Sequence, residues 1–141
     1  MLSKAITGRG APSAIVLSLA VLLVPMASSA ERPAKALPPL GTCSKTSIQL
    51  ISQRLEDGAT HRSVPNTGSA MLLKNGVYGV SYDQVAALNQ SRVGDPVYTC
   101  LVKLPRHCPP GDNRGKLYTT TNLRTEESWT LPDAEHMCGG A

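Results

Sequence analysis

Four cysteines constrain the fold of this chain more than any other feature. They are Cys43, Cys100, Cys108 and Cys138, and all of them lie after residue 42. An even count in a short exported chain is typical of a disulfide framework, whereas a reducing compartment favours metal-bound or catalytic thiols. The compartment therefore decides how the four cysteines are interpreted.

Residues 1–30 have the three zones of a cleavable secretory signal peptide. Lys4 and Arg9 give a positive start, residues 14–24 are almost entirely apolar, and residues 27–30 are small. The apolar run is shorter than the roughly 20 residues that a membrane-spanning helix needs. An internal apolar helix is the alternative, but it would not require the basic start or the small-residue end. We therefore expect a periplasmic or secreted protein with no membrane span after cleavage.

Cleavage also changes the charge of the protein. The 141 residues carry a formal charge of +4 from 14 basic and 10 acidic residues. Lys4 and Arg9 lie in the leader and no acidic residue does, so the formal charge after cleavage is +2. The remaining basic residues are scattered along the sequence rather than gathered in a run, so no nucleic-acid partner is predicted.

Export favours two disulfides over a metal site. The chain has no Phe and one Trp, so hydrophobic burial is modest and each disulfide adds about 2 to 4 kcal/mol. The alternative is a copper or zinc site in which His107 and His136 join the sulfurs of Cys108 and Cys138. No C-x-x-C pair or zinc spacing supports that site, so neither a metal nor a cofactor is predicted.

The part that follows the leader divides into two segments. Residues 31–42 contain three prolines and little to bury, which indicates a flexible or extended lead-in. Residues 43–141 show no internal repeat and no second change in composition, so they are expected to form a single disulfide-containing, β-rich domain.

Strand patterns dominate that domain. Residues 44–56 fit a helix or a strand, and the enrichment in Thr and Ile favours a strand. Residues 69–74 and 77–82 flank Asn75-Gly76, which predicts a β-hairpin with a type I′ turn and positive φ at both central residues. A short helix is expected over 83–89, with Asp83 as its N-cap.

Three further strands are expected at 97–104, 116–122 and 128–131, in an antiparallel meander. In that arrangement Cys108 and Cys138 lie beyond the same ends of the strands, which favours the pairs Cys108–Cys138 and Cys43–Cys100. The competing pairing joins Cys100 to Cys108 and Cys43 to Cys138. The predicted fold is all-β, or β-rich α+β, as a small antiparallel sandwich or partly open barrel of five to six strands.

The most distinctive segment is residues 108–116, here named the 108–116 loop. Gly111 and Gly115 allow successive N–H groups to point at an anion, and Arg114 and Lys116 add positive charge. Asp112, Arg114 and Lys116 are therefore the candidate binding residues for a protein or an anionic ligand. In the alternative interpretation the loop is only a hairpin connection, with Asp112 capping a turn.

A catalytic interpretation rests on the histidines and acids near the second disulfide. His107 and His136, with Asp133 or Glu135 as orienting carboxylates, would suit acid–base chemistry. No nucleophile elbow, zinc-protease helix or paired-carboxylate motif accompanies them, so no catalytic residue is assigned. The expected function is an exported, non-catalytic binding or inhibitor-like module of the cell envelope. A small hydrolase using His107 or His136 and a periplasmic metal-binding protein are the alternatives.

The tryptophan of the last strand and one face of the hairpin are expected to pack in the interior. Trp129, in the last strand, is predicted to fill the core because few other large apolar side chains are present. Tyr78, Val80 and Tyr82 alternate along one face of the hairpin and are also interpreted as packing residues.

Overall fold

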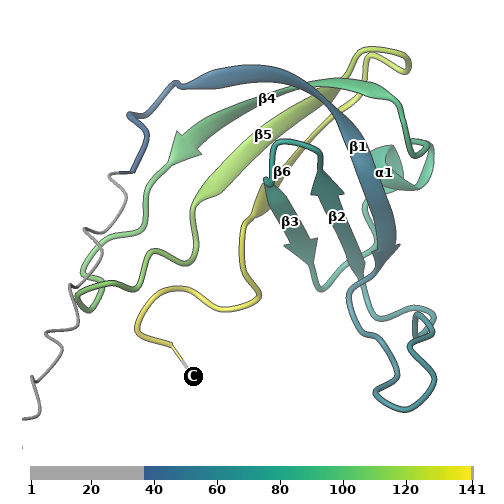
Figure 1. The fold of residues 1–141 in the computed structure, drawn as a ribbon, viewed down its shortest axis with the longest axis horizontal. Helices are drawn as coiled ribbons and strands as arrows, with labels where there is room; N and C mark the ends of the chain where they lie inside the picture. The colour runs from purple at the N-terminus through teal and green to yellow at the C-terminus, as the bar shows by residue number, and fades with distance from the viewer. Residues whose placement is uncertain (1–36, 141) are drawn as a thin grey trace, which may run out of the picture. The chain divides into compact units, whose positions relative to one another are not determined.

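Six strands and one short helix make up the computed structural model, which describes residues 37–140 (Figure 1). The elements are β1 Cys43–Gln53, β2 Ser69–Leu73, β3 Tyr78–Ser81, α1 Ala86–Asn89, β4 Pro96–Lys103, β5 Leu117–Asn122 and β6 Ser128–Pro132. The expected leader and residues 31–36 of the 31–42 segment lie outside the described residues.

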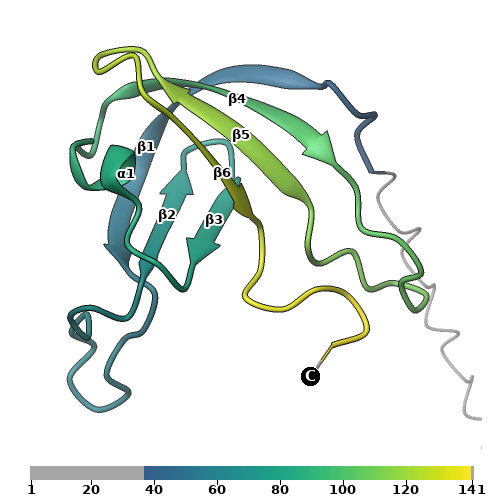
Figure 2. The ribbon, with the colours of Figure 1, turned by 180° about the vertical axis from the view of Figure 1, so that it is seen from behind.

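All six strands belong to one antiparallel sheet with the order β3-β2-β1-β4-β5-β6. The long central strand β1 pairs with β4 through its first half and with β2 through its second half. Its register shifts between Ile48 and Leu50, and a shift of this kind bends a strand. Figures 1 and 2 show β1 curving between the two half-sheets.

The curvature brings the two ends of the sheet together. The edge strands β3 and β6 lie next to each other without pairing, so the sheet closes into a partly open barrel (Figures 1 and 2). The all-β fold with six antiparallel strands confirms the predicted class.

The β2–β3 hairpin forms where Asn75-Gly76 predicted it, but its turn is not type I′. Of the two residues only Gly76 has a positive φ, of 86°, and its N–H donates to the Leu73 carbonyl over 2.9 Å. The Asn75 side chain instead accepts the N–H of Val77. This local hydrogen bond accompanies a three-residue loop that ends in a left-handed glycine, a common alternative for hairpins.

The helix α1 is shorter than expected, and its predicted cap is wrong. Its N-cap is Val85, which provides no side-chain hydrogen bond. The hydroxyl of Ser69, from β2, accepts the Val85 N–H over 2.9 Å, so a neighbouring strand supplies the missing acceptor. Leu88 faces inward and is fully buried.

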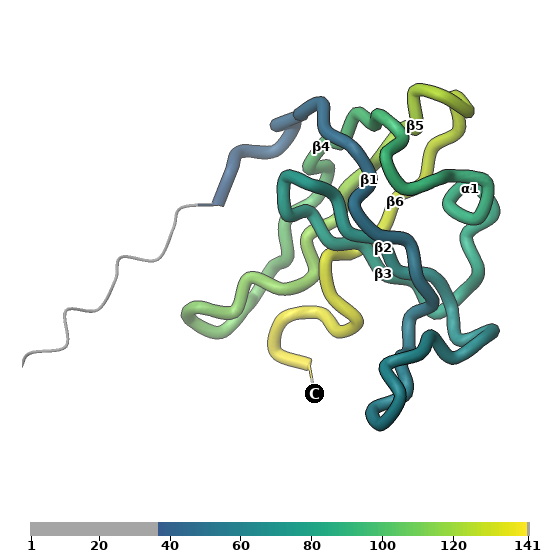
Figure 3. The backbone as a smooth tube through the Cα atoms, turned by 45° about the vertical axis from the view of Figure 1, so that its right-hand side comes forward, coloured from purple at the N-terminus to yellow at the C-terminus, as the bar shows by residue number. Residues whose placement is uncertain are grey.

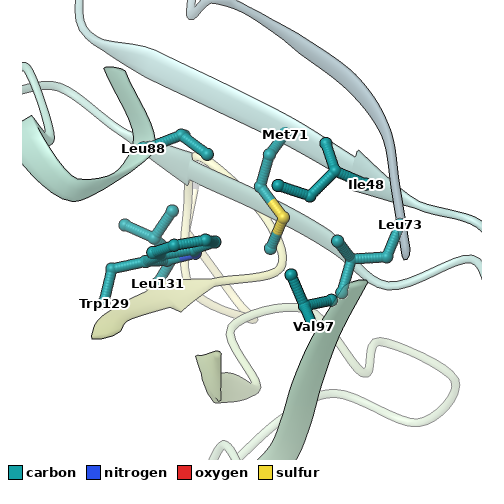
Figure 4. Close-up of a cluster of buried hydrophobic side chains, with 7 residues drawn as sticks. All are labelled: Ile48, Met71, Leu73, Leu88, Val97, Trp129 and Leu131. Atoms are coloured by element: carbon teal, nitrogen blue, oxygen red, sulfur yellow. The ribbon is translucent and has the colours of Figure 1, made fainter. Parts of the chain in front are cut away.

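A compact apolar cluster fills the barrel (Figure 4). Its buried members are Ile48, Met71, Leu73, Leu88, Val97, Trp129 and Leu131. Trp129 is 5% exposed, which confirms that it belongs to the core. Gly79 of β3 faces the same cluster, and a Cβ atom there would come within 2.7 Å of Met71 and 3.2 Å of Leu131. Met71 therefore occupies space that a side chain at residue 79 would take.

Two disulfides fasten the barrel, and they are the pairs expected from the strand order. Cys43 and Cys100 are directly opposite each other in β1 and β4. Cys108 and Cys138 join the β4–β5 connection to the C-terminal segment. All four cysteines lie in the described part of the chain, and none is free. Across residues 37–140, no helix has the length and apolar character needed to cross a membrane.

Candidate functional site

The 108–116 loop and the C-terminal segment 133–140 form one structure at the end of the barrel. Cys108 and Cys138 connect them covalently, and the Cys138 N–H donates to the Arg114 carbonyl over 3.2 Å. Figure 3 shows the C-terminal segment running beside the connection from β4 to β5. The three candidate binding residues therefore lie in a loop that a second segment supports.

Asp112 and Arg114 form a bidentate ion pair within this loop. The Asp112 oxygens accept Nε of Arg114 over 2.9 Å and Nη2 over 2.8 Å. The Gly139 N–H donates to the same carboxylate over 3.0 Å, which ties the loop to the C-terminal segment. Hydrogen bonds from Arg114, with the Gly139 amide, hold the pKa of Asp112 well below its usual range, and the carboxylate raises the pKa of Arg114.

Lys116 is paired in the same way with Asp133. One Asp133 oxygen accepts the backbone N–H groups of both Gly115 and Lys116 over 2.8 Å, and the other lies in an ion pair with the Lys116 ammonium. Lys116 also donates to the Asn113 carbonyl over 2.7 Å. The amides that the sequence offered to an external anion are therefore bound to a carboxylate of the chain itself.

Sequence reasoning placed Asp133 in a catalytic cluster and missed this contact. The signal was present in the predicted meander. In the register of β5 and β6, Leu117 is opposite Pro132, so the residues just beyond them, Lys116 and Asp133, face each other. Opposite charges at such positions attract. Asp112, Arg114 and Lys116 thus take part in ion pairs that hold the loop, and the Arg114 side chain remains 49% exposed.

The outer rim of the loop stays free for contact. The rim consists of Pro109, Pro110 and Asn113 from the loop, together with Arg106 and His107, which directly precede it. All five residues are exposed. His107 has a positive φ of 59°, so the chain turns sharply just before the disulfide. The rim joins a basic side chain, an imidazole and an amide to two conformationally fixed prolines.

A cleft of about 440 Å³ adjoins the base of the loop. Its lining includes Tyr78 from β3 and Tyr118 from β5, together with Lys116 and Asp133. Burial is the main cause that raises the pKa of both tyrosines, so both phenols stay protonated at neutral pH and can donate hydrogen bonds. The cleft therefore combines two aromatic side chains with an ion pair in its lining.

Tyr82 does not pack on the barrel in the way the sequence suggested. It is largely exposed, and the Arg54 guanidinium lies over its ring, 4.3 Å from the ring centre. Arg54 also contacts Glu135, with 3.4 Å between Nη1 and a carboxylate oxygen. Val80, on the same face, is buried, and Tyr78 is half-buried. The face is thus shared as expected, but only part of it packs.

The carboxylates of the catalytic interpretation are bound elsewhere. Asp133 pairs with Lys116 and Glu135 with Arg54, and within residues 37–140 no hydrogen bond joins either carboxylate to His107 or His136. The two sulfurs of the metal interpretation form the Cys108–Cys138 disulfide. Among residues 37–140, no group of three or more histidine, cysteine or carboxylate side chains is placed to hold a metal ion.

Comparison with protein-family models, with curated proteins and with solved structures gives no match to this chain, so its functional assignment depends on the geometry of the loop and the barrel alone.

Proposed function

We propose that this chain is an exported, non-catalytic binding module of inhibitor type, which presents the rim of the 108–116 loop to a partner protein. One observation carries the proposal: ion pairs, hydrogen bonds and a disulfide, partly within the loop and partly to the C-terminal segment, hold the loop in shape. Asp112 binds Arg114 and Gly139, Asp133 binds Lys116, and the Cys108–Cys138 disulfide joins the two segments.

Preorganisation gives such a loop a binding advantage. A segment that is already fixed loses little conformational entropy when it meets a partner, so more of the contact energy remains as affinity. Pro109 and Pro110 restrict the exposed part of the rim further. Inhibitors of secreted enzymes exploit this effect, and this domain resembles them in its small size and its disulfides.

A protein surface suits this loop better than a small anion does. The cations Arg114 and Lys116 are neutralised inside the loop, and the Gly115 and Lys116 amides already have an acceptor. The exposed groups that lie outside these ion pairs are spread over Arg106, His107 and Asn113. Exposed contacts spread over several residues favour a broad complementary partner over a compact ligand.

Export to a periplasm or to the medium is part of the proposal. Both disulfides are consistent with an oxidising compartment. The test is the N-terminal residue of the protein recovered outside the cytoplasm: we expect Glu31, and a recovered protein that still begins with residue 1 would contradict the proposed leader.

Rim variants test the binding role. Arg106→Ala combined with Asn113→Ala removes two exposed side chains without touching the ion pairs. Arg62→Ala combined with Gln90→Ala is the control, because both residues are exposed, lie away from the rim and have no positive φ. The natural protein, cross-linked in its own compartment, should capture a partner that the rim variant binds at least about tenfold more weakly. Equal capture by the rim variant, or no partner dependent on the rim, would contradict the proposal.

A further inference from the structure

Basic residues that are far apart in the sequence gather around the start of β1. Three segments meet there: 37–47, which enters β1, 73–78, which forms the β2–β3 turn, and 98–106, which ends β4. The N–H of Lys74 donates to Ser47, and the Asn75 amide donates to Ser44. On the other side, the Gly41 N–H donates to Leu101.

All charged side chains in these three segments are basic. They contain Lys45, Lys74, Lys103 and Arg106 and no Asp or Glu. All four cations are exposed, and none is in an ion pair with another described residue between 37 and 140. In contrast, Asp112 of the 108–116 loop and Asp133 of the C-terminal segment are both neutralised by cations. A positive field therefore surrounds the start of β1 although the net charge of the protein is small.

Exposed apolar side chains lie among these cations. Leu40 is 58% exposed and Val102 is 46% exposed, and the Gly41–Leu101 hydrogen bond places their two segments side by side. Leu37 and Tyr98 add further exposed apolar area on the same segments. Cations that surround exposed apolar side chains match an anionic lipid surface, where the charges meet phosphate groups and the apolar side chains enter between headgroups.

We propose that the surface around the start of β1, formed by Leu40, Lys45, Lys74, Val102 and Lys103, docks the exported protein reversibly on an anionic lipid surface. This inference goes beyond the loop function. Arg106 adjoins both surfaces, but the vesicle variants change only residues outside the rim, so either proposal can fail alone. An acidic macromolecule would use the cations but would gain little from Leu40 and Val102. That difference separates the two kinds of partner.

Vesicle binding tests the proposal with the processed protein, its leader removed and its mass verified. Vesicles that contain phosphatidylglycerol should bind it, vesicles of phosphatidylcholine alone should not, and added salt should weaken binding. Lys74→Glu with Lys103→Glu should lower the partition coefficient at least about 25-fold, since each cation contributes about fivefold. Arg62→Glu with Arg92→Glu, exposed cations outside this surface, should change it less than about twofold.

An apolar variant decides between lipid and another polyanion. Leu40→Ser with Val102→Thr keeps all charges and the strand preference of residue 102, and it should weaken vesicle binding about tenfold. Circular dichroism and thermal unfolding show whether each variant keeps the fold. Absence of binding to anionic vesicles, or equal binding by both charge variants, overturns the proposal. So does tight binding of soluble polyglutamate combined with an apolar variant that binds vesicles normally.

Discussion

Asp95 and Arg124 form a bidentate ion pair that connects the β5–β6 turn to the segment before β4. Nε of Arg124 lies 2.7 Å from one Asp95 oxygen, and Nη2 lies 2.8 Å from the other. The buried carboxylate also accepts the Asn122 amide over 2.8 Å and the Arg92 N–H over 2.9 Å. Four donors thus surround one carboxylate at the end of the barrel opposite the 108–116 loop.

Asp95→Asn should destabilise the fold. The substitution keeps the size of the side chain but removes the charge and offers an NH₂ group where Arg124 and Asn122 both donate. We expect a loss of about 1.5 to 3 kcal/mol in the free energy of unfolding, measured with urea at neutral pH. Asp83→Asn is the control, because Asp83 is exposed and has no ion pair in the described structure. Equal losses in the two variants would contradict a special role for Asp95.

The same carboxylate should make the protein sensitive to acid. The hydrogen bonds from Arg124, with those from Asn122 and Arg92, hold the pKa of Asp95 well below its usual range. A lowered pKa stabilises the folded state above the pKa of the unfolded chain, and this contribution is lost as the pH falls toward the folded-state pKa. Urea unfolding across the acid range should therefore show a weaker pH dependence in Asp95→Asn than in the natural protein. Identical dependence in both would show that other groups control acid unfolding.

Gly79→Ala should destabilise the core by about 1 to 3 kcal/mol through overpacking. The new methyl group would meet Met71 at 2.7 Å and Leu131 at 3.2 Å, and φ at this residue is not positive, so crowding is the cause. Gly58→Ala is the matched control, because a Cβ atom there has nothing within 4 Å and its φ is not positive either. A thermal midpoint for Gly79→Ala as high as that of Gly58→Ala would show that Met71 moves without cost.

The parts of this fold that sequence could predict are those set by neighbouring residues. Asn75-Gly76 specified a hairpin, and alternation and β-branched residues located the meander that led to the Cys108–Cys138 and Cys43–Cys100 pairs. The bend of β1 was not predictable, because it arises where the strand changes partner from β4 to β2. Propensity describes single segments, whereas this bend depends on a relationship among three strands.

The site was harder to predict than the fold, because charge pairing depends on register. The sequence singled out Asp112, Arg114 and Lys116, and the three do lie in one loop. It did not show that Asp133 would neutralise Lys116, nor that Lys74 would come to lie near Lys45 at the start of β1. Both relationships bring together residues that are separated by long stretches of sequence.

Removing each disulfide in turn should separate global from local stabilisation. The bridges close segments with sequence separations of 57 for Cys43–Cys100 and 30 for Cys108–Cys138. The entropy lost by the unfolded chain predicts a stabilisation of about 4 kcal/mol from each bridge. The longer closure should stabilise more than the shorter one, by about 0.6 kcal/mol. We expect Cys43→Ala with Cys100→Ala to lower the unfolding free energy of the whole barrel in urea.

Cys108→Ala with Cys138→Ala should have a second, local effect. Amide hydrogen exchange should accelerate at Gly115, Lys116 and Cys138, whose N–H groups bond within or across the two joined segments, because these segments can then separate. The β1–β2 amides should keep their exchange rates relative to global unfolding. If acceleration were uniform over the chain, the disulfide would stabilise the barrel and not the loop in particular.

Asp133→Ala should convert the internal contact between the loop and the C-terminal segment into an anion site. The substitution leaves the Gly115 and Lys116 amides and the Lys116 ammonium without their shared acceptor, which should cost about 1 to 3 kcal/mol of stability. Two adjacent N–H groups and a cation are the donors that a tetrahedral anion requires. Added phosphate should therefore raise the thermal midpoint of the variant in proportion to binding.

The natural protein, matched for ionic strength with chloride, should not respond, because its own carboxylate already fills the position. Asp83→Ala controls for the loss of a carboxylate, because Asp83 is exposed and forms no ion pair in the described structure. Equal responses to phosphate in all three proteins would mean that the Asp133 position is not the source of the effect.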